Sequence, residues 1–288
     1  MRRLAVLTLA VFLLAGCTSP TGQYVPTAEE ASQSAPPPRP VMPAATTTAD
    51  PAPTPEISAE PSSAPPAVPA PLPLAGKVVV LDAGHQLGNA NFSSEINKQV
   101  DAGGGKTKAC NTTGTATNGG FPEATVTWEV ATRVRDALTA AGAEVVMTRD
   151  SNSENEFGPC INVRGSLEND RADLLLSIHA DGAGAGSNGF HLLLPATSHP
   201  EYAGSLAFAD DLMAALNAEG LATANYVSGG MRASGDYATL NLSAKPAVIV
   251  EMGNMRNAGD AELLTSDAGQ DVYAAALASA VQTYLTTP

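Results

Sequence analysis

The chain has 288 residues and a formal net charge of -14, from 29 acidic and 15 basic residues. From residue 76 onward, acidic residues still outnumber basic ones by 24 to 12. Such a negative surface argues against a nucleic-acid partner and against broad electrostatic adhesion to anionic polymers or lipids. Any binding partner must therefore be recognised by shape and hydrogen bonds.

Residues 1–17 have the pattern of an export signal. Arg2 and Arg3 precede an apolar run that is too short to span a membrane as a helix. The run ends in Leu-Ala-Gly-Cys17, which resembles a bacterial lipobox, so we expect cleavage before Cys17 and a lipid on this cysteine. The lipid would anchor the exported chain to a membrane. An ordinary secretory signal with a chance cysteine is the alternative.

Residues 18–75 have the composition of a disordered linker. They contain 16 of the 22 prolines, mixed with alanine, serine and threonine. Because this segment lacks the bulky apolar residues that a core needs, we expect a disordered tether. We expect residues 76–288 to form one folded domain.

The folded part alternates strand and helix patterns, which predicts an α/β domain with a mostly parallel central sheet flanked by helices. Several strands are apolar on both faces, as is typical inside a parallel sheet. In chain order we expect strand 78–82, helix 123–141, strand 144–148, helix 161–171, strand 173–178, strand 189–194, helix 201–218, strand 246–251 and helix 268–285.

Chemically active side chains occur at the ends of three of these strands. One strand leads to His85, another leads to His179, and a third ends in Glu251. The carboxyl ends of parallel strands lie at the edge where α/β folds bind their ligands. Core packing alone does not require an imidazole or a carboxylate at the end of three separate strands. The recurrence therefore predicts a metal-binding or catalytic site.

The segment 86–120 is rich in glycine, asparagine and threonine and has no strand or helix period. It is too long for a simple connector in a compact domain. We interpret it as a wall or flap of a substrate groove rather than a regular element. Lys98, Lys106 and Lys108 within it either meet acidic groups of a substrate or are solvated charges.

Glu123 lies in the first turn of the expected helix 123–141, whose apolar positions recur every three or four residues. Taken alone, a carboxylate at this place more often complements the helix dipole than binds a ligand. The residues by themselves leave both interpretations open.

The cysteines favour an oxidising compartment. If Cys17 carries lipid, only Cys110 and Cys160 remain, each in a loop where a thiol has no packing role. We predict that they form a disulfide. Two free thiols or a soft metal site are the alternatives, although the pair lacks the CxxC spacing of a zinc site.

Five motifs occur in a fixed order along residues 76–288. They are Leu81-Asp-Ala-Gly-His85, Glu123 at a helix start, Arg171-Ala-Asp173 leading into Ser177-Ile-His179-Ala, Gly189 before a strand, and Pro246-Ala-Val-Ile-Val-Glu251-Met-Gly253-Asn254. Each motif alone is weak, but the ordered set resembles the zinc-dependent N-acetylmuramoyl-L-alanine amidases of the amidase-3 type. That family cuts peptidoglycan between the glycan and the stem peptide.

The resemblance implies that His85, Glu123 and His179 bind one Zn²⁺ and that Glu251 is the catalytic acid/base. Two imidazoles and one carboxylate leave the fourth zinc position open for catalysis. The substrate implied is peptidoglycan or muropeptides, cut at the amide bond between the lactyl group of N-acetylmuramic acid and L-alanine.

Three further residues have open roles. Asp82 and Asp181 either orient a ligand imidazole from a second layer or complete the hydrogen bonding at a strand end. His191, in the expected strand 189–194, is more typical of a half-buried structural residue than of a substrate contact.

Two other functions are compatible with parts of this pattern. A zinc peptidase that cuts within the stem peptide would use the same ligands. A non-catalytic wall-binding lipoprotein would not need Glu251. We expect an exported, lipid-anchored monomer that acts as the amidase.

Overall fold

The structure is a computed structural model that describes residues 71–287. The predicted export signal, Cys17 and the predicted linker up to residue 70 lie outside the described residues. Within residues 71–287, no helix is long and apolar enough to cross a membrane.

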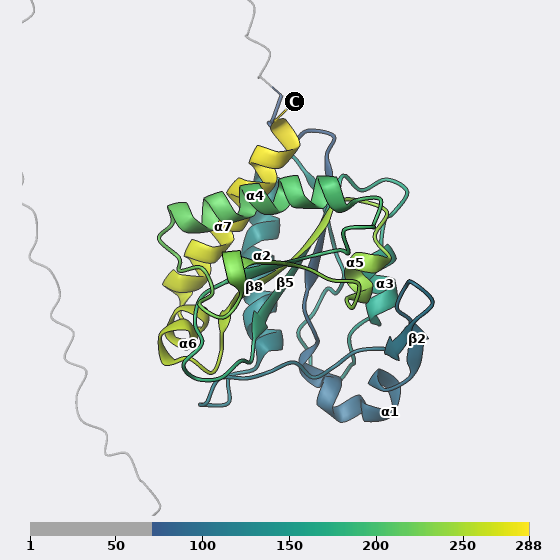
Figure 1. The fold of residues 1–288 in the computed structure, drawn as a ribbon, viewed down its shortest axis with the longest axis vertical. Coiled ribbons are helices and arrows are strands. Elements are labelled where there is room, and N and C mark those ends of the chain that lie inside the picture. The colour runs from purple at the N-terminus through teal and green to yellow at the C-terminus, as the bar shows by residue number, and fades with distance from the viewer. Residues whose placement is uncertain (1–70, 288) are drawn as a thin grey trace, which may run out of the picture. The chain divides into compact units, whose positions relative to one another are not determined.

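A six-stranded sheet forms the centre of the domain, in the order β4-β1-β5-β8-β6-β7 (Figure 1). Four neighbouring strands are parallel, β6 runs antiparallel to β8, and β7 runs parallel to β6. The bounds are Val78–Ala83 for β1, Glu144–Met147 for β4, Leu174–Asp181 for β5, His191–Leu194 for β6, Met231–Ala233 for β7 and Ala247–Asn254 for β8. The prediction of a mostly parallel α/β sheet is confirmed.

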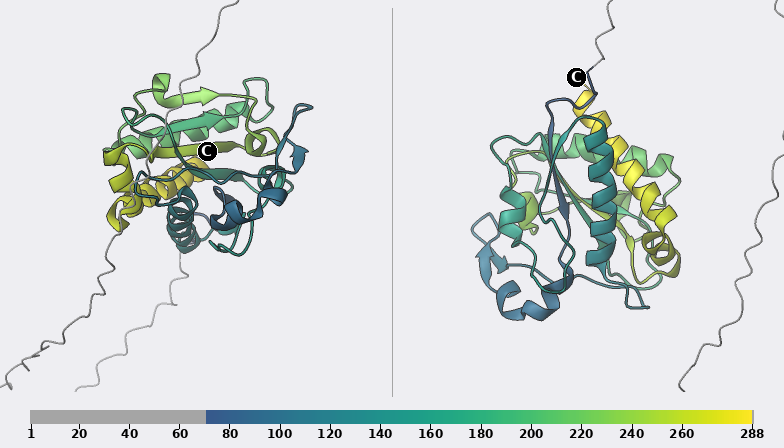
Figure 2. Two further views of the ribbon diagram at one scale, coloured as in Figure 1. Left: turned by 90° about the horizontal axis from the view of Figure 1, so that it is seen from below. Right: turned by 180° about the vertical axis from the view of Figure 1, so that it is seen from behind.

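Long helices pack against one face of this sheet. They are α2 (Glu123–Ala140), α4 (Tyr202–Ala218) and α7 (Asp267–Thr286), with the shorter α6 (Ala258–Thr265) beside α7. Figure 2 shows α2 and α7 side by side. Alternate strand residues, such as Val79 and Leu176, point into this large apolar core because side chains alternate between the two faces of a strand.

The opposite face carries a smaller core in which Val80, Leu175 and Ile249 pack against Leu240. Leu240 belongs to the one-turn helix α5 (Ala238–Asn241), which packs on the short helix α3 (Ile161–Ser166). By the two-residue period of a strand, the next positions on this face are polar, and they include Asp82, Ser177, His179 and Glu251. The candidate site therefore lies on the face with the smaller core.

The segment between His85 and Glu123 contains regular structure, which corrects our expectation of an irregular loop. It forms the 3₁₀ helix η1 (Leu87–Phe92), the short helix α1 (Ser93–Ile96) and a hairpin of β2 (Gln99–Asp101) and β3 (Thr107–Ala109). These pieces form an arm at one side of the domain (Figure 1). They are too short for a period of hydrophobic residues to reveal them.

Other element bounds differ from the predictions at specific places. The helix expected over 161–171 ends at Ser166, because Leu167 leaves the helical region and Glu168 has a positive φ of 55°. Strands β5 and β8 extend three residues beyond their expected ends. Leu74, which we assigned to the linker, is fully buried, and its N–H donates to Ala141 O at 2.9 Å. The folded part therefore begins before residue 76.

Candidate metal centre and active site

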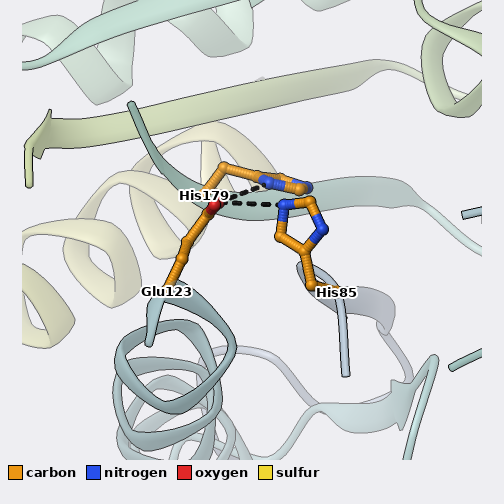
Figure 3. A group of neighbouring side chains, drawn as sticks. All are labelled: His85, Glu123 and His179. Atoms are coloured by element: carbon orange, nitrogen blue, oxygen red, sulfur yellow. Dashed lines mark hydrogen bonds and ion pairs between the residues drawn. The ribbon is translucent and has the colours of Figure 1, made fainter. Parts of the chain in front are cut away.

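His85, Glu123 and His179 come together from three different elements (Figure 3). His85 Nε2 lies 3.1 Å from Glu123 Oε1, and His179 Nδ1 lies 2.9 Å from the same oxygen. One nitrogen or oxygen atom from each residue lies within 4.8 Å of the others. Two imidazoles and one carboxylate at this spacing could hold a metal ion, and the set is typical of catalytic zinc.

The His85 ring is oriented by the segment that follows the hairpin. Its Nδ1 lies 3.0 Å from the carbonyl oxygen of Thr112. Because a carbonyl can only accept, Nδ1 carries a proton, and Nε2 is the ring nitrogen that faces Glu123 Oε1. Two electron-rich atoms facing each other at 3.1 Å fit a cation bound between them.

Glu123 is buried, with only 3% of its surface exposed. Its Oε2 accepts from the N–H of Thr115 at 2.9 Å, and its Oε1 accepts from the N–H of Ala180 at 3.2 Å. Burial alone would raise the pKa of this carboxyl, but His85 and His179 lower the pKa well below its usual range. The carboxylate is thus ionised and turned toward the imidazoles, so it does more than complement the helix dipole.

His179 is held from behind by Arg164 on α3. Arg164 Nη2 lies 3.0 Å from His179 Nε2, and a guanidinium can only donate, so Nδ1 carries the ring proton toward Glu123. A metal ion at Nδ1 would require the other neutral tautomer, with the ring proton on Nε2, and Arg164 would then no longer donate a hydrogen bond to this ring. Burial lowers the pKa of His179, which favours the neutral ring that metals bind.

Asp82 acts on the site through Arg164 rather than through an imidazole. Arg164 Nε and Nη2 donate to the two carboxylate oxygens at 2.7 Å each, and both residues are buried. Thr148 and Ser177 donate to the same carboxylate. Burial alone would raise the pKa of Asp82, but Arg164 holds it well below its usual range. No described hydrogen bond joins Asp82 to a ligand ring.

Asp181 makes its described hydrogen bonds at the end of β5, and none of them joins it to a candidate ligand imidazole. It accepts from the hydroxyl of Tyr226 at 3.0 Å and from the N–H of Gly182. The same hydroxyl lies 3.5 Å from Nδ1 of His191, whose ring packs edge-on against Tyr226. His191 is buried, and it is absent from the described lining of the cavity, as expected of a structural residue.

Glu251 lies directly beside His179, because the two residues are register partners on β8 and β5. It is half-buried and lines the same cavity as the three-residue group without belonging to that group. Burial, followed by the negative charges of Glu123 and Asp181, raises the pKa of Glu251 well above its usual range. A carboxyl with a raised pKa beside a metal-competent group is suited to take up and release a proton.

A cavity of about 560 Å³ opens onto these groups, which is a typical size for a ligand site. Its lining includes several residues of the segment 108–115, together with Tyr237 and Thr239. Our interpretation of the long segment as a groove wall therefore holds for its last part.

The lysines of the arm are paired within the protein. Lys106 forms an ion pair with Asp236 at 3.0 Å, Lys108 donates to the carbonyl of Asp236, and Lys98 pairs with Glu95. The contacts of Lys106 and Lys108 fasten the hairpin to the loop around Asp236, which also lines the cavity.

The predicted disulfide between Cys110 and Cys160 is confirmed. It joins the end of β3 to the residue that precedes α3, and its two Cα atoms are 4.3 Å apart. Both neighbouring segments contribute to the cavity through Asn111 and Ile161. The covalent bond thereby connects two parts of the groove wall.

A sequence profile described as N-acetylmuramoyl-L-alanine amidase matches residues 79–283, which include every candidate site residue of the folded part. The chain belongs to the N-acetylmuramoyl-L-alanine amidase family. Members of this family are hydrolases of peptidoglycan that depend on a metal, and they cut the bond between the lactyl group of N-acetylmuramic acid and L-alanine. This chain is accordingly an exported cell-wall amidase.

Relatives of this amidase match nearly their whole length. An N-acetylmuramoyl-L-alanine amidase of Mycobacterium tuberculosis is 39% identical over 221 residues, which cover 75% of this chain and 90% of the relative. The crystal structure of an N-acetylmuramyl-L-alanine amidase of Mycobacterium smegmatis is 38% identical, with a TM-score of 0.70 over 74% of this chain and 98% of that one. The apo form from Mycobacterium abscessus is 42% identical, with a TM-score of 0.70 over 74% and 100%.

Sequence reasoning missed two buried arginines and one carbonyl of the amidase site. Arg149 follows β4 by two residues, as His85 follows β1, so the rule that found the strand-end ligands could have found it as well. Arg164 has no such signal, because its burial depends on how α3 packs. The carbonyl of Thr112 has none either, because every residue offers a carbonyl.

Proposed function

We propose that this amidase binds one Zn²⁺ through His85, Glu123 and His179 and uses Glu251 as its general base and acid. The bound ion would supply Lewis-acid polarisation of a carbonyl and a lowered pKa of water. The position of Glu251 beside His179, in the cavity but outside the ligand group, is the observation that carries this assignment.

The roles of the chain's own groups follow from this placement. Glu251 takes a proton from the attacking water, whose oxygen bonds to the lactyl carbonyl carbon. The C–N bond then breaks, and Glu251 returns the proton to the departing nitrogen of L-alanine. The products are a lactyl carboxylate on the glycan and a peptide with a free amino terminus.

The groups behind the ligands keep the site in place before substrate arrives. Thr112 O orients His85, and the Asp82–Arg164 pair lies behind His179. Partners of this kind limit the movement of the ligand side chains and tune the metal.

A first experiment measures zinc and products on the same sample. We expect one zinc per chain and, with defined muropeptides, products whose masses correspond to cleavage before L-alanine. Masses from cleavage inside the stem peptide would favour the peptidase. Binding of muropeptides without any product would favour the non-catalytic lipoprotein.

The role of Glu251 is tested by Glu251→Gln. The variant should keep its zinc and bind muropeptide, while peptide release falls by about 10²–10⁴-fold, the range for general acid–base groups. The control is Glu219→Gln, at the exposed end of α4, which should match the wild type. Unchanged turnover in Glu251→Gln would remove Glu251 from the mechanism.

We further propose that a lipid on Cys17 anchors the exported amidase to a membrane and that residues 18–70 act as its tether. A tether of this length would let the catalytic domain, acting as a monomer, reach the overlying wall. In the producing cell, Cys17→Ala should move the protein from the membrane to the soluble fraction. Persistent membrane attachment of the variant would contradict the lipid anchor. Sedimentation of the catalytic domain tests the monomeric state, and a dimer would contradict it.

A further inference from the structure

Arg149 is a buried cation that no described carboxylate pairs with. Only 6% of its surface is exposed, and its hydrogen bonds go to neutral oxygens. Burial lowers the pKa of Arg149 to about 10, so the guanidinium stays charged at neutral pH. A buried charge without a directly paired carboxylate is costly and is retained only where its hydrogen bonds are numerous and well placed.

The partners of Arg149 lie next to two of the three candidate metal ligands. Its Nε donates to Ala83 O at 3.0 Å, two residues before His85. Its Nη2 donates to Ala124 O at 2.7 Å, directly after Glu123. One rigid, planar group thus connects the turn that carries His85 to the first turn of α2.

The other side of the guanidinium is fixed independently. Its Nη1 donates to Ser151 O at 2.6 Å and to the side-chain oxygen of Asn152 at 3.2 Å. The guanidinium also lies over the ring of Trp128, with 5.0 Å between its carbon and the ring centroid. The position of Arg149 is therefore set by residues outside the metal group.

The turn that Arg149 contacts needs external support. His85 has a φ of +62°, a left-handed conformation that costs free energy for any residue with a Cβ. Gly84 before it leaves no room for a side chain, because a Cβ there would lie 2.4 Å from Cε1 of His179. The carbonyl of Gly84 accepts from Thr127 Oγ1 at 2.7 Å and from Arg149 Nη2 at 3.5 Å.

We propose that Arg149 is a positioning residue for the metal. It sets the separation of the His85 turn and the start of α2, and hence the separation of His85 Nε2 and Glu123 Oε1. Arg149 is absent from the described lining of the cavity, so it acts through the backbone and touches neither metal nor substrate. This inference rests on the metal assignment proposed above.

Arg149→Met and Arg149→Lys test the inference on the full-length protein. We expect Arg149→Met to bind zinc about 10–100-fold more weakly in competition with a chelator, as for other outer partners of metal sites. The visible absorption bands of the Co²⁺-loaded protein should also change, because they report ligand geometry. A lysine has one nitrogen in place of the planar fork, so Arg149→Lys should restore little of this loss.

Arg133→Met is the control, because Arg133 is an arginine of α2 that pairs with Asp267 and Asp271 of α7 and makes no described contact with the candidate ligands. It should bind zinc and show Co²⁺ bands like the wild type.

If Arg149→Met does not fold, the same zinc and Co²⁺ measurements are made on Arg149→Lys and on Thr127→Val. The Thr127→Val substitution removes the hydrogen bond from the threonine hydroxyl to Gly84 O. Zinc affinity within twofold of wild type, with unchanged Co²⁺ bands, would overturn the proposal even if stability falls. A wild-type protein that binds no zinc would overturn the metal assignment itself.

Discussion

The two faces of the central sheet receive side chains from the same strands but differ in character. Under α2, α4 and α7, the strand residues are apolar along their whole length, as Val79 and Leu81 show on β1. On the other face, Val80 is apolar and is followed two residues later by Asp82. The two-residue period of a strand thus separates packing from chemistry.

The two faces also differ in what their stability requires. On the helical face, each fully buried aliphatic or aromatic side chain contributes about 1.5–3 kcal/mol by leaving water. On the site face, the buried charges of Asp82 and Arg164 are tolerated because each has well-placed partners. Substitutions on the two faces should therefore have different consequences.

The largest effect is expected for Glu123→Ala, which removes a candidate metal ligand. Loss of the carboxylate ligand should abolish tight zinc binding and reduce turnover by more than about 10³-fold, equivalent to more than about 4 kcal/mol. Elemental analysis and muropeptide digestion measure the two quantities. Glu129→Ala, on the same helix, should keep both. Full zinc occupancy in Glu123→Ala would show that the ion is held elsewhere.

A change on the helical face should affect stability alone. Phe208 of α4 is fully buried, with its ring 5.2 Å from that of Tyr284. Phe208→Ala should lower the free energy of unfolding by about 3–4 kcal/mol, within the range for buried aromatic truncations. Denaturant unfolding measures this loss. Zinc affinity and turnover per folded molecule should stay at wild-type values, and a parallel fall in zinc affinity would show that the faces are coupled.

Asp82→Asn tests a charge that serves both stability and the site. The folded-state pKa of Asp82 lies below its ordinary value of 3.8, so its carboxylate stabilises the fold above about pH 4. This contribution is lost as the pH falls through the folded-state pKa. At pH 7 the variant should lose about 3 kcal/mol, because Arg164 remains buried without its partner.

The same variant should show a flatter decline of stability between about pH 5 and pH 2 than the wild type. Denaturant unfolding with a chelator present excludes any contribution from metal loss. Asp136→Asn, at an exposed position on α2, serves as the control and should follow the wild-type curve. Parallel curves for Asp82→Asn and wild type would contradict the role of this ion pair.

Much of the fold could be predicted because its signals are local. The parallel strands are continuous apolar runs, and α2 and α7 are long enough for a clear period. The arm, α5 and β7 escaped prediction because elements of three to six residues have no measurable period. The early end of α3 depends on the chain turning back at Leu167 and Glu168, which the apolar pattern does not encode.

The amino-acid sequence by itself determined which chemically active residue types stand in or just after the carboxyl-terminal parts of three strands, and in this chain those are His85, His179 and Glu251. The ordered set of five motifs that contains them was enough to indicate the family. Only the tertiary structure decided that Glu123 turns inward to both imidazoles, and that Arg149 and Arg164 lie behind the ligands. The physical reason is that burial and the direction of a side chain arise from the packing of distant segments, which no local pattern records.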